Sequence, residues 1–294
     1  MYIHAKTEQA PTESLNLIRA GIETESRLLD DRVVLVTGTS SGFGKQTASL
    51  LATRGFRVFG TSRKPSGEKQ ETEMLQLDVT SDESVKGCVS NLLQKAGRID
   101  VLINNAGQVL TGGLEETSLD EAKAHFDSNF FGAVRMVNAV LPEMRKRRSG
   151  QIINVASLAG TFPVPFEGYY GVAKAALMAY SDVLRQEVKS LGVNVSVIEP
   201  GFFKTSIIQH RARAANAIGD YDEMRKKTLR VLEESVNNGG DPQEVADAIL
   251  KIIENPSPAL HYVVGQEKRY ILLKRILPAS TMESQTRKHW RLDE

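Results

Sequence analysis

Cysteine is nearly missing from this chain of 294 residues, since Cys88 is the only one. A single thiol excludes an intramolecular disulfide and a thiolate metal cluster. An apolar series at helical spacing contains this thiol, and it comprises Val85, Cys88, Val89, Leu92 and Leu93. We therefore interpret Cys88 as a thiol packed in the core.

The chain also lacks an excess of either charge, and it has no long apolar run. The chain has 37 Lys and Arg against 36 Asp and Glu, and its net charge of +1 predicts no nucleic-acid partner. No stretch approaches the roughly 18 uninterrupted apolar residues of a membrane span, and the first residues show no signal peptide. The five histidines show no paired ligand spacing, so no metal site is expected. We expect a cytoplasmic protein without a transmembrane segment.

Short apolar runs alternate with longer amphipathic stretches from residue 32 onward. The runs cover residues 33–36, 57–60, 74–79, 101–103, 152–155, 193–198 and 261–264. Several are apolar throughout, as expected of strands covered on both faces by helices. Residues 32–294 are therefore predicted to form one α/β domain, a Rossmann-type doubly wound parallel sheet of about seven strands flanked by helices.

Local signals refine this outline. Capping-box patterns predict helix starts at Thr80 and Ser118. Residues 1–31 are polar, and we interpret them as an amino-terminal extension.

A glycine-rich turn, TGTSSGFG, follows the first strand at residues 37–44 and leads into a helix. Glycines let the backbone approach a pyrophosphate, and a helix amino end offers free N–H groups to it. No Gly-Lys-Ser/Thr run closes a Walker loop. We interpret the turn as a dinucleotide loop rather than a plain turn, with cofactor contacts at Gly38, Ser40, Ser41, Gly42, Phe43 and Gly44.

The end of the second strand, GTSRK at residues 60–64, carries no carboxylate. An acidic residue there would hold the ribose 2′-hydroxyl of NAD, whereas an arginine accommodates the 2′-phosphate of NADP. Because a guanidinium can clamp a phosphate in two places, Arg63 favours NADP(H). The alternative is that Arg63 is an ordinary surface residue.

With these features the chain resembles the short-chain dehydrogenase/reductase family over roughly residues 32–201. The motifs that carry the resemblance are TGTSSGFG, Asp78-Val79, Asn104-Asn105-Ala106-Gly107, Asn129, Ser157, Tyr170 with Lys174, and Pro200-Gly201. Their order and spacing are specific as a set. The carboxyl-terminal part looks most like the 17β-hydroxysteroid and retinol dehydrogenase branch.

The resemblance implies further cofactor contacts. Asp78 would bind the adenine amino group, and Thr205 would bind the nicotinamide carboxamide. The remaining contacts that it implies are Val79, Asn105, Ala106, Gly107, Tyr170, Lys174, Pro200 and Gly201.

Two tyrosines stand side by side, and only Tyr170 lies four residues before Lys174, on the same helix face. Tyr169 would point about 100° away. The resemblance implies a catalytic set of Ser157, Tyr170, Lys174 and Asn129. The alternative is that all four residues are structural.

Each member of this set has an expected task. Tyr170 would donate the proton, with its pKa lowered by Lys174 and by the positive nicotinamide. Ser157 would orient the substrate oxygen, and Asn129 would hold a water that connects Lys174 to solvent.

Apolar residues follow the catalytic motifs at 162–166 and in an expected substrate loop and helix at about 202–237. They predict an NADP(H)-dependent oxidoreductase of a lipophilic ketone or aldehyde, steroid-, retinoid- or polyketide-like, although such residues are also ordinary core. The enzymatic alternative is a 3-oxoacyl-thioester reductase. An alternative of another class is a non-catalytic NADP-binding sensor or scaffold.

Two further segments bear on partners. The helices expected at 118–148 and 168–191 resemble the family's dimer interface, so we predict a homodimer or homotetramer. Residues 268–277 could form a membrane-surface helix. Because Arg269 falls inside its apolar arc, we favour packing near the substrate opening.

Overall fold

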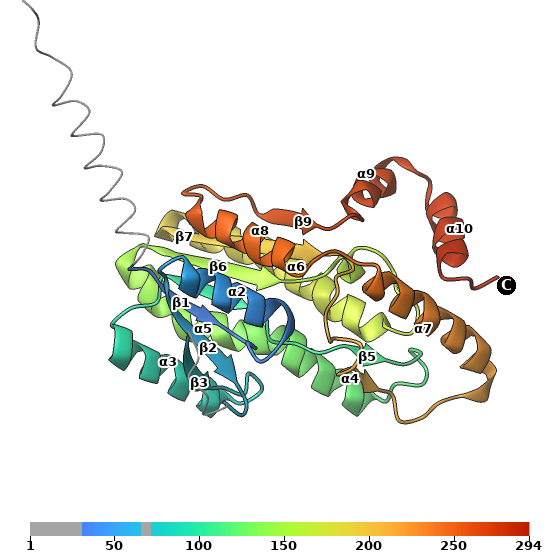
Figure 1. The fold of residues 1–294 in the computed structure, drawn as a ribbon, viewed down its shortest axis with the longest axis horizontal. Coiled ribbons are helices and arrows are strands. Elements are labelled where there is room, and N and C mark those ends of the chain that lie inside the picture. The colour runs from blue at the N-terminus through green and yellow to red at the C-terminus, as the bar shows by residue number, and fades with distance from the viewer. Residues whose placement is uncertain (1–30, 66–71, 294) are drawn as a thin grey trace, which may run out of the picture.

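The computed structural model describes residues 31–65 and 72–293, so the expected extension at residues 1–31 lies almost wholly outside the described residues. Seven parallel strands form one sheet in the order β3-β2-β1-β4-β6-β7-β9 (Figure 1). Their bounds are β1 (Val33–Val36), β2 (Arg57–Ser62), β3 (Glu73–Gln76), β4 (Val101–Asn104), β6 (Gly150–Val155), β7 (Val193–Pro200) and β9 (His261–Val264). The predicted doubly wound fold is confirmed.

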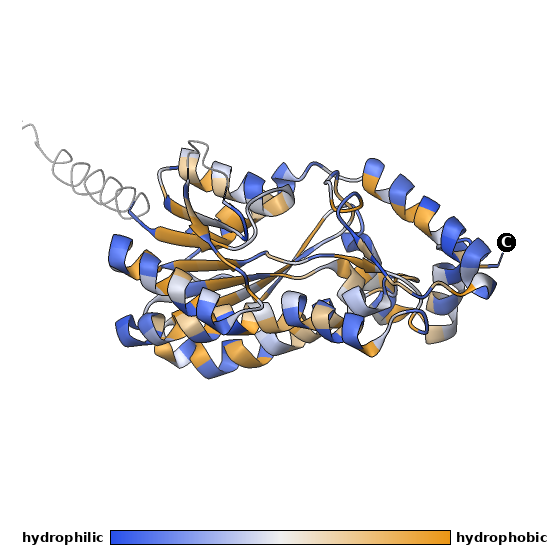
Figure 2. Ribbon diagram, turned by 90° about the horizontal axis from the view of Figure 1, so that it is seen from below, coloured by the Kyte–Doolittle hydropathy of each residue, from blue (hydrophilic) through white to orange (hydrophobic). Residues whose placement is uncertain are grey.

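Helices cover both faces of the sheet. One face packs on α3 (Asp82–Ala96), α5 (Gly132–Arg147) and α6 (Gly168–Val188), and the other packs on α2 (Gly42–Thr53) and α8 (Gln243–Glu254). Figure 2 shows the apolar strands between helices whose outer surfaces are hydrophilic. Cys88 belongs to the first apolar cluster and is 4% exposed, which confirms its interpretation as a core thiol.

The two predicted helix starts have different outcomes. Ser118 caps α4 (Leu119–Phe126) with a complete capping box. The cap of α3, however, is Ser81 and not Thr80. The Thr80 hydroxyl instead donates to a carboxylate oxygen of Asp78 at 2.7 Å, so it is not available to the helix.

A second group of elements lies beyond the carboxyl edge of the sheet. It comprises the paired strands β5 (Leu110–Thr111) and β8 (Ala212–Arg213), and the helices α7 (Asp222–Asn237), α9 (Lys268–Ile276) and α10 (Ala279–His289) (Figure 1). Short 3₁₀ turns cover Leu158–Gly160, Lys189–Leu191 and Gly219–Tyr221. Trp290 packs with Val231 and Leu232 in a cluster separate from the two sheet faces. Within the described part of the chain, no helix is long and apolar enough to cross a membrane.

Candidate active site

The glycine loop and the Asn104–Gly107 turn follow β1 and β4, which meet where the strand order reverses. Thr37 joins the two turns, because its hydroxyl oxygen accepts the N–H groups of Asn105 and Ala106 at 3.0 and 2.9 Å. The Asn105 amide donates to the carbonyl oxygens of Thr37 and Gly38, both at 2.9 Å. Parallel sheets bind ligands at this switch point.

The geometry of the loop fits a dinucleotide. Gly38 has φ 71°, and a Cβ there would lie 2.9 Å from the Cα of Ala106, so only glycine fits. Around Gly42, with φ 58°, no heavy atom of the described residues lies within 4 Å of an added Cβ. The first turn of α2 has no acidic residue and no side-chain cap, and it therefore offers free N–H groups and positive dipole to this open space.

The expected adenosine contacts gather at the ends of β2 and β3. Asp78 has a lowered pKa because Thr80 donates to its carboxylate from the backbone and the hydroxyl, and the charge of Arg63 adds to this effect. Arg63 is exposed, and its effect on the pKa of Asp78 shows that the two side chains lie within electrostatic reach of each other. Val79 packs against Gly132, where a Cβ would lie 2.7 Å from its Cγ2.

The catalytic candidates Ser157, Tyr170 and Lys174 lie together at the carboxyl end of β6. The Tyr170 hydroxyl hydrogen-bonds with Ser157, which lies two residues beyond the end of this strand. The Lys174 ammonium lies 5.8 Å from the centre of the Tyr170 ring and donates to the Val155 carbonyl at 2.8 Å. Tyr169 is not part of the cavity wall as the described residues define it.

Burial dominates the electrostatics of this pair. It raises the pKa of Tyr170 to about 12, against the hydrogen bond from Ser157, and Glu167 adds to the rise. Burial also lowers the pKa of Lys174 to about 8. In the protein alone, the shift of Tyr170 is opposite to the expected direction, because that expectation counted Lys174 and the nicotinamide but left out burial.

Asn129 lies on a π turn, Asp127–Phe131, between α4 and α5. Its Oδ1 accepts the N–H of Gln108 at 3.1 Å, and its Nδ2 donates to the His125 carbonyl at 3.0 Å. A Cβ added at Gly107 would lie 2.6 Å from Asn129 Oδ1 and 3.7 Å from Lys174 Nζ. The Asn129 amide and the Lys174 ammonium thus approach each other across a glycine. π turns are rare and frequently occur at functional sites.

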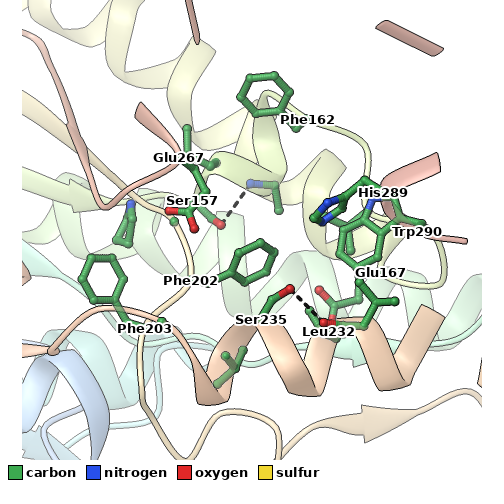
Figure 3. Close-up of a pocket in the computed structure, with 18 of the residues that line it drawn as sticks. Ser157, Phe162, Glu167, Phe202, Phe203, Leu232, Ser235, Glu267, His289 and Trp290 are labelled. Atoms are coloured by element: carbon green, nitrogen blue, oxygen red, sulfur yellow. Dashed lines mark hydrogen bonds between the residues drawn. The ribbon is translucent and has the colours of Figure 1, made fainter. Parts of the chain in front are cut away.

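Ser157 and Tyr170 line a cavity of about 670 Å³. Figure 3 shows Ser157 among other residues of its wall. Its apolar wall includes Phe162, Val164, Phe202, Phe203, Leu232 and Trp290. Pro200, Gly201 and Thr205, the expected nicotinamide contacts, line the same cavity, as does Phe43 from the glycine loop. Arg269 and Tyr270 of α9 also line it, so this helix packs at the substrate opening as we favoured.

Several titratable residues at the site were missed from the sequence, among them His125, Glu167 and Arg211. Burial, followed by the charge of Lys174, lowers the pKa of His125 to about 4, and its ring centre lies 6.2 Å from that of Tyr170. Glu167 and Arg211 both line the cavity. Glu167 could have been found, because it lies three residues before Tyr170 and therefore on the same helix face.

Comparison with known proteins agrees with this geometry. Residues 32–216 match the family described as short chain dehydrogenase. The chain therefore belongs to the short-chain dehydrogenase/reductase family, and it is an oxidoreductase of carbonyl or alcohol groups that uses a nicotinamide cofactor.

Individual relatives differ in their substrates. The chain is 39% identical to a 3-ketodihydrosphingosine reductase of Bacteroides thetaiotaomicron, covering 81% of this chain and 89% of the relative. It is 37% identical to retinol dehydrogenase 8 of Bos taurus, over 78% and 80% of the two chains. A crystal structure of a short-chain dehydrogenase from Streptomyces avermitilis superposes with a TM-score of 0.75 at 30% identity, covering 89% of this chain and 97% of that one.

Proposed function

We propose that this protein is a cytoplasmic, NADP(H)-dependent reductase of lipophilic ketones or aldehydes. The observation that carries the proposal is the single cavity that joins Ser157 and Tyr170 to a predominantly apolar wall. The names of two relatives, a 3-ketodihydrosphingosine reductase and a retinol dehydrogenase, support a lipid-like substrate.

The reaction is a hydride transfer coupled to a proton transfer. NADPH, when bound, supplies the hydride to the carbonyl carbon. Tyr170 donates its hydroxyl proton to the carbonyl oxygen, while Ser157 holds that oxygen by a hydrogen bond. Lys174 keeps a positive charge beside the tyrosine and stabilises the tyrosinate that remains.

The experiment that tests this activity is NADPH oxidation over a panel of long-chain ketones, retinal, ketosteroids and a 3-oxoacyl thioester. We expect turnover of at least one of the first three. Exclusive turnover of the thioester would support the acyl-thioester alternative. Binding of NADPH with no turnover of any carbonyl would contradict the proposal and favour a sensor.

The cofactor preference gives a separate prediction. We expect NADPH to bind at least about tenfold more tightly than NADH, about 1.4 kcal/mol, because Arg63 can pair with the 2′-phosphate and no carboxylate opposes it. Fluorescence titration of both cofactors measures this preference. Arg63→Ala should remove it, Ser62→Asp should shift it toward NADH, and Arg54→Ala, at the far end of α2, is the matched control. Equal affinities in the parent protein would contradict the assignment.

We further propose a homodimer or homotetramer. Leu119 of α4 and Phe131 of the π turn are 70% and 49% exposed, and both line a surface hollow. Val172 and Val183 of α6 are 54% and 58% exposed. Association would bury these apolar side chains. Light scattering should give at least twice the 32.4 kDa of one chain at micromolar concentration, and a monomer mass would argue against assembly.

A further inference from the structure

Glu267 contributes a carboxylate to the cavity wall (Figure 3). It is the last residue before α9, and its side chain does not cap that helix. Its Oε2 is buried, and no residue that the structure describes donates a hydrogen bond to it. A buried carboxylate oxygen without a donor is unfavourable. This oxygen is therefore suited to a group of positive charge that binds in the cavity.

The other charged side chains of the wall have partners of their own. Three arginines of the wall donate hydrogen bonds: Arg291 to Glu234 at 3.2 Å, Arg211 to Glu233 at 2.9 Å, and Arg269 to the Tyr270 hydroxyl at 3.1 Å. The charge of Arg211 also acts on Glu167. Burial keeps the pKa of His289 below its usual value, although the charge of Glu267 raises it, so this imidazole is largely neutral at pH 7. Lys268, the next residue, is exposed.

Two glycines leave room for the Glu267 carboxylate at the end of the sheet. Gly201 directly follows β7, and its N–H donates to the carbonyl of Val264, the last residue of β9, at 2.9 Å. A Cβ added at Gly201 would overlap Oε2 of Glu267, and a Cβ added at Gly265 would lie 2.8 Å from it. The carboxylate therefore lies against the backbone at Gly201.

The reacting end of the cofactor has to reach the same part of the cavity. Hydride passes to the carbon whose oxygen the catalytic residues hold, so the nicotinamide ring must lie next to that carbon. The dinucleotide extends from the glycine loop, where Phe43 packs edge-on against Phe203 with the ring centres 5.5 Å apart. Gly201 lies two residues before Phe203, and both line the cavity. We therefore expect the nicotinamide at the wall that Gly201 and Glu267 form.

The charge of the nicotinamide ring distinguishes the two forms of the cofactor. The ring is neutral when it is reduced, and it carries one positive charge after hydride has left it. A carboxylate beside the ring attracts the oxidised form, and the attraction is stronger at a partly buried site than in water. The same attraction stabilises the positive charge that develops on the ring during hydride transfer.

We propose that Glu267 is a cofactor-binding residue whose carboxylate interacts with the positive nicotinamide ring and so favours binding of the oxidised cofactor over the reduced one. The reduced cofactor is then a stronger hydride donor when bound than it is in water, and release of the oxidised cofactor is slower. This inference rests on the nicotinamide position that the proposed function uses, but it depends neither on the substrate nor on the 2′-phosphate.

Calorimetric titration of NADP⁺ and NADPH into the parent protein and into Glu267→Gln tests the proposal. We expect the Kd of NADP⁺ to rise at least about tenfold in the variant, while the Kd of NADPH changes less than about twofold. Glu267→Ala, a second neutral variant, should show the same shift. Glu267→Asp keeps the charge and should stay closer to the parent ratio. If the protein prefers NAD⁺ and NADH, the same comparison applies, because the ring is the same.

Two controls restrict the effect to the ring. Glu234→Gln removes one negative charge from the same cavity wall and should leave the ratio of the two Kd values as it is. A cofactor fragment that ends at the second ribose, 2′-phosphoadenosine 5′-diphosphoribose, has no nicotinamide. It should bind the parent protein and Glu267→Gln equally well.

Three results would overturn the proposal. The first is an equal loss of affinity for both cofactor forms together with a lower melting temperature, because Glu267 would then only stabilise the start of α9. The second is tighter binding of both forms by Glu267→Gln, since the side chain would then obstruct the site. The third is an unchanged ratio in both neutral variants.

The proposed function and the role of Glu267 fail in different ways. If the ratio shifts as expected but no carbonyl compound is reduced, the proposed function is wrong and the assignment of Glu267 remains. If carbonyl compounds are reduced but neither neutral variant shifts the ratio, only the role of Glu267 is wrong.

Discussion

Tyr170→Phe is expected to lower kcat by about 10²- to 10⁴-fold, the usual contribution of a general acid–base group. The substitution removes one oxygen and keeps the ring that packs near His125. Binding of NADPH should therefore stay nearly unchanged. Steady-state kinetics measure the rate, fluorescence titration measures the cofactor affinity, and circular dichroism checks that the variant is folded.

The neighbouring tyrosine is the matched control for this experiment. Tyr169→Phe removes the same atom one position away, about 100° around the helix, and should change the rate by less than about tenfold. A folded Tyr170→Phe variant that turns over as fast as the parent would show that the proton comes from another group. An inactive Tyr169→Phe variant would show that Tyr169, and not Tyr170, carries the chemistry.

Lys174→Met is expected to damage both the rate and the cofactor affinity. The change removes a buried charge 5.8 Å from the Tyr170 ring centre and the hydrogen bond to the Val155 carbonyl at 2.8 Å. Tyrosinate loses its nearest cation, so kcat should fall by about 10²-fold or more. In family members that the sequence resembles, this lysine also binds the nicotinamide ribose, and the Kd of NADPH should therefore rise.

The pH profile separates this charge effect from a loss of packing. A positive neighbour lowers the pKa of a tyrosine, so removing it must raise that pKa. The alkaline rise in the rate of alcohol oxidation should therefore move to higher pH in Lys174→Met. In the protein alone the pKa is about 8 for Lys174 and about 12 for Tyr170, so the profile is measured at saturating NADP⁺, whose positive nicotinamide also lowers the pKa of the tyrosine. Lys189→Met, an exposed position after α6, should leave the profile in place, and an unshifted profile in Lys174→Met would refute the electrostatic role.

The main sheet could be predicted because each strand is a short apolar run with its own helix signal beside it. All seven runs became strands, although β3 ends at Gln76, before the predicted end at residue 79. After that point the N–H of Asp78 donates to the Ser84 hydroxyl and not to a neighbouring strand. Most of the family motifs were also local, since they lie within a few residues of a strand end, whereas Asn129, Tyr170 and Lys174 lie on helical segments.

Other features depend on contacts between segments far apart in the chain, and no periodic pattern of residues in the sequence predicts such contacts. Arg211 meets Glu167 only because β8 pairs with β5, and two-residue strands give no recognisable pattern. Trp290 reaches Val231 and Leu232 only after the chain has turned back over the cavity. The expected shift of the pKa of Tyr170 had the wrong sign for the protein alone, because residue spacing does not show how deeply a side chain is buried.

The last strand, β9, ends at Val264, and both α9 and α10 come after it. The sheet, the glycine loop and the catalytic residues are therefore complete before the chain forms the part of the cavity wall that comes from α9 and the residues after it. Mutations after residue 267 can alter the shape of that wall while the hydride-transfer machinery is inherited unchanged. Descendants of this protein could thus acquire new substrates by divergence of a short carboxyl-terminal segment, under little constraint from the ancestral chemistry.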